Sequence, residues 1–472
     1  MNNVHIVTLG CSKNEVDSSM MYSLLNKDKY KMVDDASEAD ILIVNTCGFI
    51  DAAKEESIDT ILESVEYKNK GKCKKVLLSG CLAQRYPEEL LKEIPEIDGI
   101  IGTGNINYIN ELLDRSMAGD LFVKTDNLNS AYIEGIKKET VNKTEFVKIS
   151  EGCNNNCSYC IIPSLRGKNR SRKIEDIYSE VEYLVKKGAR EIILIAQNTT
   201  DYGIDLYSKY SLAKLIKEIS KIEDLKWIRV LYLYPDHFTD ELIEEFRTND
   251  KLVKYVDMPL QHISDNVLKS MNRKTSKSHI IKTLKNLRKA IPEIVIRTTF
   301  IVGFPGENEE DFKDLVDFIE DIKFDKLGVF EYSREDGTKA AILDNQIPNE
   351  VKKRRKDEIM EIQSGISSEI LSKNLGKTLE VLIEEKIDKN NYVGRTYMDA
   401  PEIDGVTYIE SSKNLEVGDF VKVKVIDTLD YDLVGEAIWT LQINWLLWEL
   451  SWFLFLYYVC IWILIIRESL QL

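Results

Sequence analysis

Short apolar runs alternate with amphipathic stretches along the first 115 or so residues of the chain. Residues 4–9, 41–46 and 76–79 have the composition of buried strands, and each run is followed by residues with helical spacing. The predicted helices span residues 15–26 and 52–67, and a shorter one begins at Pro87. This alternation predicts an open parallel sheet covered by helices, with a domain at residues 1–118.

The same alternation continues with a different rhythm through residues 139–369, the second predicted domain. Its strand candidates are residues 146–149, 191–196, 227–233, 255–258, 294–302 and 326–332. Helical patterns separate them, at residues 174–187, 212–221, 240–246, 279–290 and 309–322. Six β/α units in succession predict a complete or partial (β/α)6 barrel, whose site would lie at the carboxyl-terminal rim of the strands.

The pattern changes again after a basic helix predicted over residues 352–375. Residues 371–440 contain short β runs at 378–383, 406–409 and 420–427, separated by turn sequences. They predict a small antiparallel β-barrel of the OB-like kind, which commonly serves as a binding platform.

The last segment, residues 441–472, does not match the rest. Residues 450–466 carry no charged side chain, and this length is at the short end for a membrane span. Three readings compete: a membrane anchor, a helix packed on the surface, or translated sequence unrelated to an ancestral end. The third is favoured because the β module looks finished at Ile438, and membrane contact is expected only if the first holds.

Composition narrows the class of protein. With 44% hydrophobic and 30% charged residues among 472, the chain is globular. No basic segment followed by an apolar one opens it, so no signal peptide is predicted and the expected location is the cytoplasm. Reduced cysteines that bind metal are then favoured over disulfides. The net charge of −16 is unfavourable for nucleic acid and acceptable for a basic protein partner.

Three of the eight cysteines form a local cluster, Cys153, Cys157 and Cys160, with the spacing C-x3-C-x2-C. Thiolates are soft ligands that favour iron–sulfur clusters, zinc or copper(I). Structural zinc and ferredoxin clusters usually take four protein ligands, and no fourth cysteine or histidine lies nearby in the sequence. Three ligands at a predicted barrel rim therefore favour a four-iron cluster with one iron left open.

A second set of three cysteines is dispersed. Cys11, Cys47 and Cys81 each follow one of the predicted strands of the first domain. In open parallel sheets, ligands bind beyond the carboxyl ends of the strands, so these side chains are predicted to meet there as a ligand set. The alternative is three small buried residues at strand ends, because free cysteine is often buried.

The local cluster, with the aromatic Tyr159 before its last cysteine, resembles the signature of the radical S-adenosylmethionine superfamily. The resemblance implies that S-adenosylmethionine chelates the open iron of a [4Fe-4S] cluster and yields a radical that removes hydrogen from carbon. The implied cofactor contacts are Tyr159, the pair Gln197–Asn198, and Gly303 and Gly306 in a run resembling the superfamily's glycine-rich strand. The glycine run reads equally well as a tight strand-to-helix turn.

Both cysteine sets together, followed by a small β module, resemble the methylthiotransferases over residues 1–438. The resemblance implies two [4Fe-4S] clusters, the second of which supplies or relays sulfur. It also implies two uses of S-adenosylmethionine, as methyl donor and as radical source, so that C–H becomes C–S–CH3. Residues 371–440 would be a TRAM-like module that binds substrate, and a flavodoxin or ferredoxin would donate electrons.

Four segments resemble the RimO-type methylthiotransferases, at residues 161–172, 230–236, 259–265 and 399–405. The implied reaction is methylthiolation of an aspartate β-carbon in protein S-twelve of the small ribosomal subunit. The alternatives are a transfer-RNA adenosine methylthiotransferase (MiaB-like) and a non-catalytic metal or redox scaffold. Residues 376–439 hold 14 Asp and Glu against 7 Lys and Arg, which disfavours direct nucleic-acid binding.

Other rim candidates follow from position alone. Asp236 and His262 lie at or just beyond predicted strand ends, where a catalytic role and a structural role are equally compatible with the sequence. Basic residues are concentrated from Arg166 to Lys173, where they would contact the cofactor, steer an acidic substrate or form an exposed loop. Because both open irons must reach one substrate, the active site is expected at the interface between the first two domains.

Overall fold

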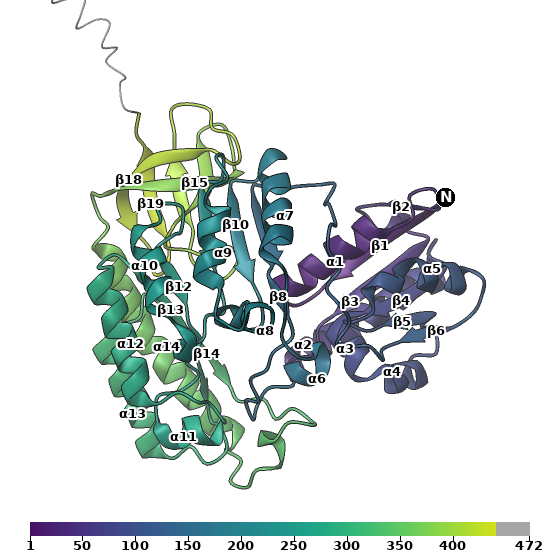
Figure 1. The fold of residues 1–472 in the computed structure, drawn as a ribbon, viewed down its shortest axis with the longest axis horizontal. Coiled ribbons are helices and arrows are strands. Elements are labelled where there is room, and N and C mark those ends of the chain that lie inside the picture. Colours follow the sequence, from purple (N-terminus) through teal and green to yellow (C-terminus); the bar gives the residue numbers. More distant parts are fainter. Residues whose placement is uncertain (440–472) are drawn as a thin grey trace, which may run out of the picture.

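A computed structural model describes residues 1–439 of the chain (Figure 1). The hydrophobic segment predicted at residues 441–472 lies outside the described residues. Among residues 1–439, no helix has the length and apolar character needed to cross a membrane.

The first part of the chain is a six-stranded parallel sheet in the order β2-β1-β3-β4-β5-β6. Its strands are β1 (Asn2–Thr8), β2 (Tyr30–Met32), β3 (Ile41–Thr46), β4 (Lys75–Ser79), β5 (Gly99–Ile101) and β6 (Phe122–Lys124). The three long strands were predicted. The three others have three residues each, too few for an apolar pattern to stand out from a loop.

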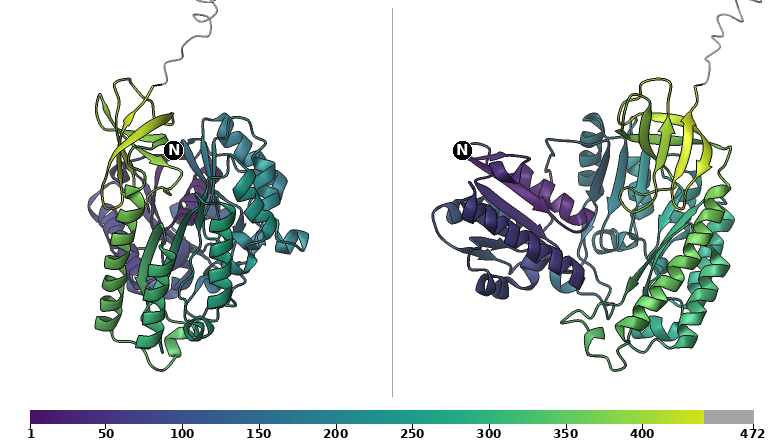
Figure 2. Two further views of the ribbon diagram at one scale, coloured as in Figure 1. Left: turned by 90° about the vertical axis from the view of Figure 1, so that its left-hand side faces the viewer. Right: turned by 180° about the vertical axis from the view of Figure 1, so that it is seen from behind.

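Helices cover both faces of this sheet (Figure 2). They are α1 (Ser12–Leu24), α2 (Asp51–Lys70), α3 (Gly80–Arg85), α4 (Pro87–Glu93) and α5 (Ile109–Met117), with 3-10 turns η1 (Ala36–Glu38) and η2 (Ile106–Tyr108). In β3, Ile41 and Ile43 pack toward α1 and α5, whereas Leu42 and Val44 pack toward α2, α3 and α4. Burial on both faces explains why this strand is a continuous apolar run.

The central part is an incomplete barrel of two three-stranded parallel sheets, β11-β10-β7 and β12-β13-β14. The strands are β7 (Thr144–Lys148), β10 (Glu191–Ile195), β11 (Trp227–Val230), β12 (Tyr255–Asp257), β13 (Val295–Val302) and β14 (Lys326–Glu331). A bridge between Ile228 and Leu252 links the two sheets near β11 and β12. Within the described chain, β7 and β14 are not paired. The predicted partial (β/α)6 barrel is therefore confirmed.

Helices surround the outside of the barrel and share one core with its strands. They are α7 (Ile174–Lys186), α9 (Leu212–Ile219), α10 (Asp240–Thr248), α12 (Lys277–Ala290), α13 (Glu309–Ile322) and α14 (Asn349–Ser372). Short elements near the rim were not predicted: β8 (Ser150–Glu151), β9 (Arg170–Ser171), α6 (Ile162–Arg166), α8 (Ile204–Tyr207), α11 (Asp265–Ser270), η3 (Thr199–Asp201), η4 (Pro235–His237) and η5 (Ala340–Ile342).

The last part is a closed five-stranded barrel in the order β15-β16-β17-β19-β18, called here the β module. Its strands are β15 (Thr378–Lys386), β16 (Asn391–Thr396), β17 (Thr407–Glu410), β18 (Phe420–Thr428) and β19 (Leu433–Ala437). All neighbours pair antiparallel except β17 and β19, which are parallel. The sequence did not indicate β16 and β19. Each contains a glycine, Gly394 or Gly435, where a Cβ would lie within 2.5 Å of a neighbouring strand.

Buried charges fix the β module against the barrel. Arg395 Nη2 lies 2.5 Å from Glu191 Oε2, and Arg229 Nε donates to Glu191 Oε1 at 2.8 Å. Lys326 Nζ lies 2.6 Å from Asp399 Oδ1. Glu191 and Lys326 are the first residues of β10 and β14. The β module therefore covers the amino-terminal end of the barrel, as Figure 1 shows, opposite the rim where the cysteines follow β7.

The substitution Glu191→Gln should destabilise the folded chain by about 3 kcal/mol, because it leaves two buried guanidinium groups without their shared carboxylate. Urea unfolding followed by circular dichroism measures the effect as a lower midpoint. Glu244→Gln, which breaks an exposed pair with Arg247, is the control and should leave the midpoint almost unchanged. Equal midpoints for the two variants would contradict this account.

Candidate active site

The dispersed cysteines meet at one edge of the first sheet. Cys11 follows β1, Cys47 follows β3, and Cys81 lies in the first turn of α3, directly after β4. β3 pairs with both β1 and β4, so the three turns are adjacent. At Gly10, whose φ is +89°, an added Cβ would stand 2.9 Å from the sulfur of Cys47. Glycine is required there because the two cysteine-bearing turns approach so closely.

These thiols are electrostatically coupled to one another and to Arg166. Burial alone would raise the pKa of Cys11, but the charges of Lys13 and Arg166 lower it below its ordinary value. Burial raises the pKa of Cys81 to about 11, with the Arg166 guanidinium acting in the opposite direction. Burial also raises the pKa of Cys47. A guanidinium beside three thiols is the charge that would stabilise them as thiolate ligands.

Arg166 is held in a buried network that joins the first domain to the barrel. Its Nη1 lies 2.9 Å from Asp17 Oδ2 and 3.2 Å from Glu151 Oε1, and its Nη2 donates to Asn14 Oδ1 at 2.7 Å. Lys148 Nζ pairs with Glu151 at 2.5 Å and also with Asp17. Asn14 and Asp17 belong to α1, whereas the other residues belong to the barrel rim. Two cations and two carboxylates thus balance across the interface.

The basic segment after the local cysteines is therefore not the exposed patch that the sequence suggested as one alternative. Arg166 is buried, and Arg172 is buried against Asp176 and Glu180 at 2.5 and 2.6 Å. Only Lys168 and Lys173 of the five basic residues are exposed. The burial of Arg166 depends on Asp17, which is far away in sequence, so it could not be predicted from a local run of basic residues.

The local cysteines lie in the loop between β8 and α6, beyond the carboxyl end of β7, as predicted. All three are partly buried. Burial raises the pKa of Cys153 to about 11 and that of Cys160 to about 12, and Cys157 adds to both shifts. The Cys153 backbone N–H donates to the Gly167 carbonyl at 3.1 Å, which closes the loop. The three thiols thus form a second coupled set.

The two cysteine sets flank the same interface. Cys81 packs in one apolar cluster with Ile161 and Leu165, and Ile161 directly follows Cys160. α3, which carries Cys81, packs against α6. The sulfur-bearing edge of the sheet and the cysteine loop of the barrel are therefore neighbours.

The donor set fits iron–sulfur clusters better than a single metal ion. Every cysteine in the described part of the chain is a free thiol. Within residues 1–439, no three His, Cys, Asp or Glu side chains surround one point as ligands of a single ion do. A four-iron cluster takes each thiolate on a different iron, so its ligands stand farther apart. Two sets of three free thiols provide the type and number of ligands that two such clusters would take.

The residues proposed to contact S-adenosylmethionine differ in their unpaired polar atoms and in the space around them. Gln197 Nε2 donates to Glu151 at 2.9 Å, while its Oε1 is buried without a partner among the described residues. Asn198 Nδ2 is buried and likewise unpartnered there. A Cβ added at Gly306 would have no atom of the described residues beyond its chain neighbours within 4 Å. At Gly303, by contrast, an added Cβ would lie 2.3 Å from the side chain of Lys352. Glycine is favoured at position 303 both by this contact and by its φ of +70°, so packing alone explains the residue.

Asp236 and His262 are placed differently. Asp236 lies in η4 after β11, and its Oδ2 is buried without a partner in residues 1–439. His262 is completely buried, and burial lowers its pKa to about 3, so the ring is neutral. Its Nδ1 accepts from the Ser264 N–H at 3.0 Å. His262 is thus part of the packed barrel wall, while Asp236 is at the rim.

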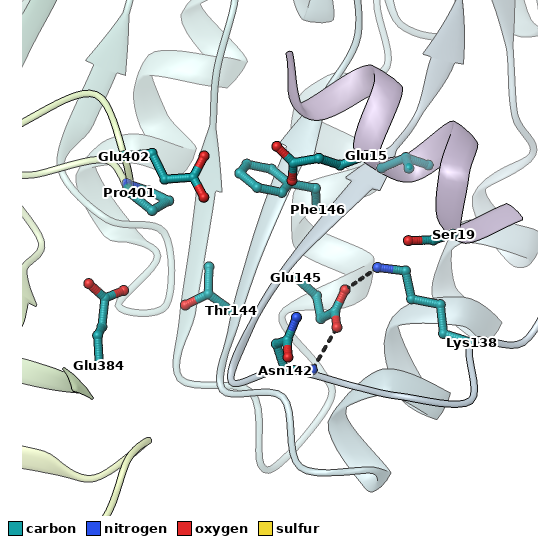
Figure 3. A pocket seen from close by; sticks show the side chains of 11 residues that line it. Glu15, Ser19, Lys138, Asn142, Thr144, Glu145, Phe146, Glu384, Pro401 and Glu402 are labelled. Carbon is teal, nitrogen blue, oxygen red and sulfur yellow. Dashed lines mark hydrogen bonds and ion pairs between the residues drawn. The ribbon is translucent and has the colours of Figure 1, made fainter. Parts of the chain in front are cut away.

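A cleft of about 370 Å³, shown in Figure 3, has no cysteine in its lining. It is formed by residues of α1, the segment before β7, the amino-terminal end of β7 and the β module, among them Glu15, Lys138, Glu145, Glu384 and Glu402. Lys138 pairs with Glu145 at 2.5 Å. Burial and the Glu402 carboxylate raise the pKa of Glu15. The cleft is acidic and is distinct from the cysteine-bearing interface.

Comparisons with known proteins match all three parts of the chain. Residues 147–319 match the radical SAM superfamily, residues 3–102 match the uncharacterized protein family UPF0004, and residues 375–438 match the TRAM domain.

Full-length relatives decide the family. A protein of Clostridioides difficile (strain 630) is 50% identical over 443 residues, which cover 93% of this chain and 100% of the relative. One of Thermoanaerobacter sp. (strain X514) is 52% identical over 438 residues, with 92% and 100% covered. Both are named ribosomal protein uS12 methylthiotransferase RimO. The chain belongs to the RimO family.

Solved structures support the fold of this RimO-family chain. The radical S-adenosylmethionine methyltransferase TsrM from Kitasatospora setae, with cobalamin and a [4Fe-4S] cluster bound, gives a TM-score of 0.52 at 13% identity. The match covers 72% of this chain and 77% of that chain. At that identity the likeness concerns the fold alone.

Replacing Arg166 with Met should destabilise the chain by about 3 kcal/mol, because Asp17 and Glu151 would share only Lys148 as a buried cation. The midpoint of thermal unfolding measures the loss. In the background of Asp17→Asn the same substitution should cost less, because the two residues act together. Lys168→Met is the control, because Lys168 is exposed and forms no ion pair within residues 1–439, and it should leave the midpoint almost unchanged. Additive effects of Arg166→Met and Asp17→Asn would contradict the network.

Proposed function

We propose that the chain methylthiolates the β-carbon of an aspartate in ribosomal protein uS12. The observation that carries the proposal is the pair of free cysteine triplets on one interdomain interface in a chain of the RimO family. When bound, one [4Fe-4S] cluster and S-adenosylmethionine would supply the radical, and the second [4Fe-4S] cluster would supply or relay the sulfur. In the net reaction a C–H bond becomes C–S–CH3, the hydrogen leaves on 5′-deoxyadenosine, and a second S-adenosylmethionine gives the methyl group.

The cysteines divide into two roles in this proposal. Cys153, Cys157 and Cys160 hold the cluster that binds S-adenosylmethionine. The other cluster, which handles sulfur, is held by Cys11, Cys47 and Cys81. Gln197 and Asn198 have buried polar atoms free to contact the cofactor, and Tyr159 and Gly306 complete the proposed contacts. Asp236 stays a rim candidate, whereas we assign His262 and Gly303 to packing.

The division of labour follows the three parts of the chain. Residues 1–118 carry the sulfur cluster, residues 139–369 the radical site, and residues 371–440 a surface for substrate. The acidity of the β module, with 14 carboxylates against 7 basic residues over 376–439, suits a basic ribosomal protein. The electron would come from a low-potential donor such as flavodoxin or ferredoxin, and the reaction would take place in the cytoplasm.

The two triplets should fail differently when one cysteine is removed. Cys157→Ala is expected to abolish 5′-deoxyadenosine formation, because the radical cluster loses a ligand. Cys47→Ala should keep at least part of that activity while methylthiolated product disappears. Reconstituted protein, with about eight irons per chain in the wild type, is assayed for both products by mass spectrometry.

Cys73→Ala is the matched control, because Cys73 is buried in the same domain but belongs to neither triplet. It should retain both activities. Loss of both products to the same degree in Cys47→Ala and Cys157→Ala would show that the first triplet is structural. Zinc in place of iron, with no turnover, would support a non-catalytic scaffold instead.

The substrate is tested in a strain that lacks the gene. Mass spectrometry should find uS12 without its methylthio group, and the modified adenosines of transfer RNA unchanged. Complementation with the wild-type gene should restore the modification of uS12, whereas the Cys157→Ala gene should not. If the transfer-RNA modification vanishes while the protein modification persists, the chain acts on RNA and the substrate proposed here is wrong.

A further inference from the structure

A second buried arginine, Arg273, lies beside the local cysteine loop between α11 and α12. Its Nη1 donates to the Tyr159 hydroxyl at 3.2 Å, and its Nη2 donates to the Pro259 carbonyl at 2.9 Å. The guanidinium also stands over the ring of Tyr234, 4.3 Å from its centroid. Arg273 is thus fixed in one position by neutral groups.

The backbone next to Arg273 is bound to the cysteine loop itself. The Ser158 N–H donates to the Met271 carbonyl at 2.9 Å, and the Ser158 hydroxyl donates to the Ser270 carbonyl at 2.7 Å. Asn272 Nδ2 donates to the Asn156 carbonyl at 2.6 Å. Together with the Tyr159 contact, these bonds attach residues 270–273 to the loop along four positions. Any charge on Arg273 is therefore held at a fixed place relative to Cys157 and Cys160.

The charge of Arg273 has no counterpart in the described part of the chain. No carboxylate of residues 1–439 forms an ion pair with Arg273, and its Nε is buried without a hydrogen-bond partner there. Arg166, beside the other triplet, differs because Asp17 and Glu151 neutralise it. A buried cation without a counter-charge is costly, so an anion is expected near Arg273 when the site is loaded.

We propose that Arg273 is the counter-charge of the iron–sulfur cluster on Cys153, Cys157 and Cys160 and raises its reduction potential. The inference rests on the proposed function. Three thiolates outweigh the charge of the oxidised cluster core, and the electron from the low-potential donor adds one further negative charge. A fixed buried cation stabilises the reduced form more than the oxidised form, because net charge near a cluster sets its potential.

The test uses the full chain carrying Cys11→Ala, Cys47→Ala and Cys81→Ala, so that only the cluster of interest remains. Into this parent are introduced Arg273→Gln, Arg273→Lys and, as a matched control, Lys274→Gln. Lys274 is the neighbouring residue and carries the same charge, but it is exposed, so solvent and salt screen it. Each protein is reduced stepwise with dithionite, without S-adenosylmethionine, and the reduced cluster is followed by electron paramagnetic resonance.

Arg273→Gln should shift the potential to more negative values, while Arg273→Lys and Lys274→Gln should stay close to the parent. If Arg273→Gln holds no iron while Arg273→Lys does, the anionic cluster requires the cation, which also supports the proposal. An unchanged potential in Arg273→Gln overturns it, as does the same shift in Arg273→Lys or Lys274→Gln.

Two further outcomes distinguish a failure of the inference about Arg273 from a failure of the proposed function. If Arg273→Gln keeps the parent potential but weakens S-adenosylmethionine binding, the anion is the carboxylate of that cofactor and the inference is wrong while the proposed function stands. If the parent itself binds no four-iron cluster, the assignment of Cys153, Cys157 and Cys160 fails, and the proposed function fails with it.

Discussion

The contact between the guanidinium of Arg166 and the carboxylates of Asp17 and Glu151 is the interaction on which the site depends. All three groups are buried, and they come from two different domains. Burying such charges is unfavourable unless every partner is present, so the network is complete only when α1 is docked on the barrel rim. That docking brings Cys81 against Ile161 and so makes two separate cysteine sets into one site.

Much of this arrangement could be predicted because it depends on short-range pattern and on general rules of parallel sheets. The runs at residues 41–46 and 191–196 are apolar because both faces of β3 and β10 are buried. Three cysteines that follow neighbouring parallel strands lie at one edge of the sheet, so Cys11, Cys47 and Cys81 could be grouped although they are far apart in sequence. The C-x3-C-x2-C spacing needed no structure at all.

What could not be predicted involves pairing over long separations. Arg166 looked like one member of a basic run, and its partner Asp17 is 149 positions away. Arg273 could not be singled out from the sequence, because it is distinguished by the lack of a paired carboxylate within residues 1–439 and by its bond to Tyr159, 114 positions away. His262 was a rim candidate by its position after β12, and its side chain is completely buried. Sequence position locates a strand end and leaves the direction of a side chain undetermined.

The β module is attached to the first residues of the barrel strands, and the cysteine loop follows the last ones. A strand of five residues such as β7 is about 16 Å long, so the two ends of the barrel are well separated. If the module holds the substrate as proposed, recognition takes place at the opposite end of the barrel from the cysteine loop. Only a substrate long enough to reach from one end to the other could then use both surfaces at once.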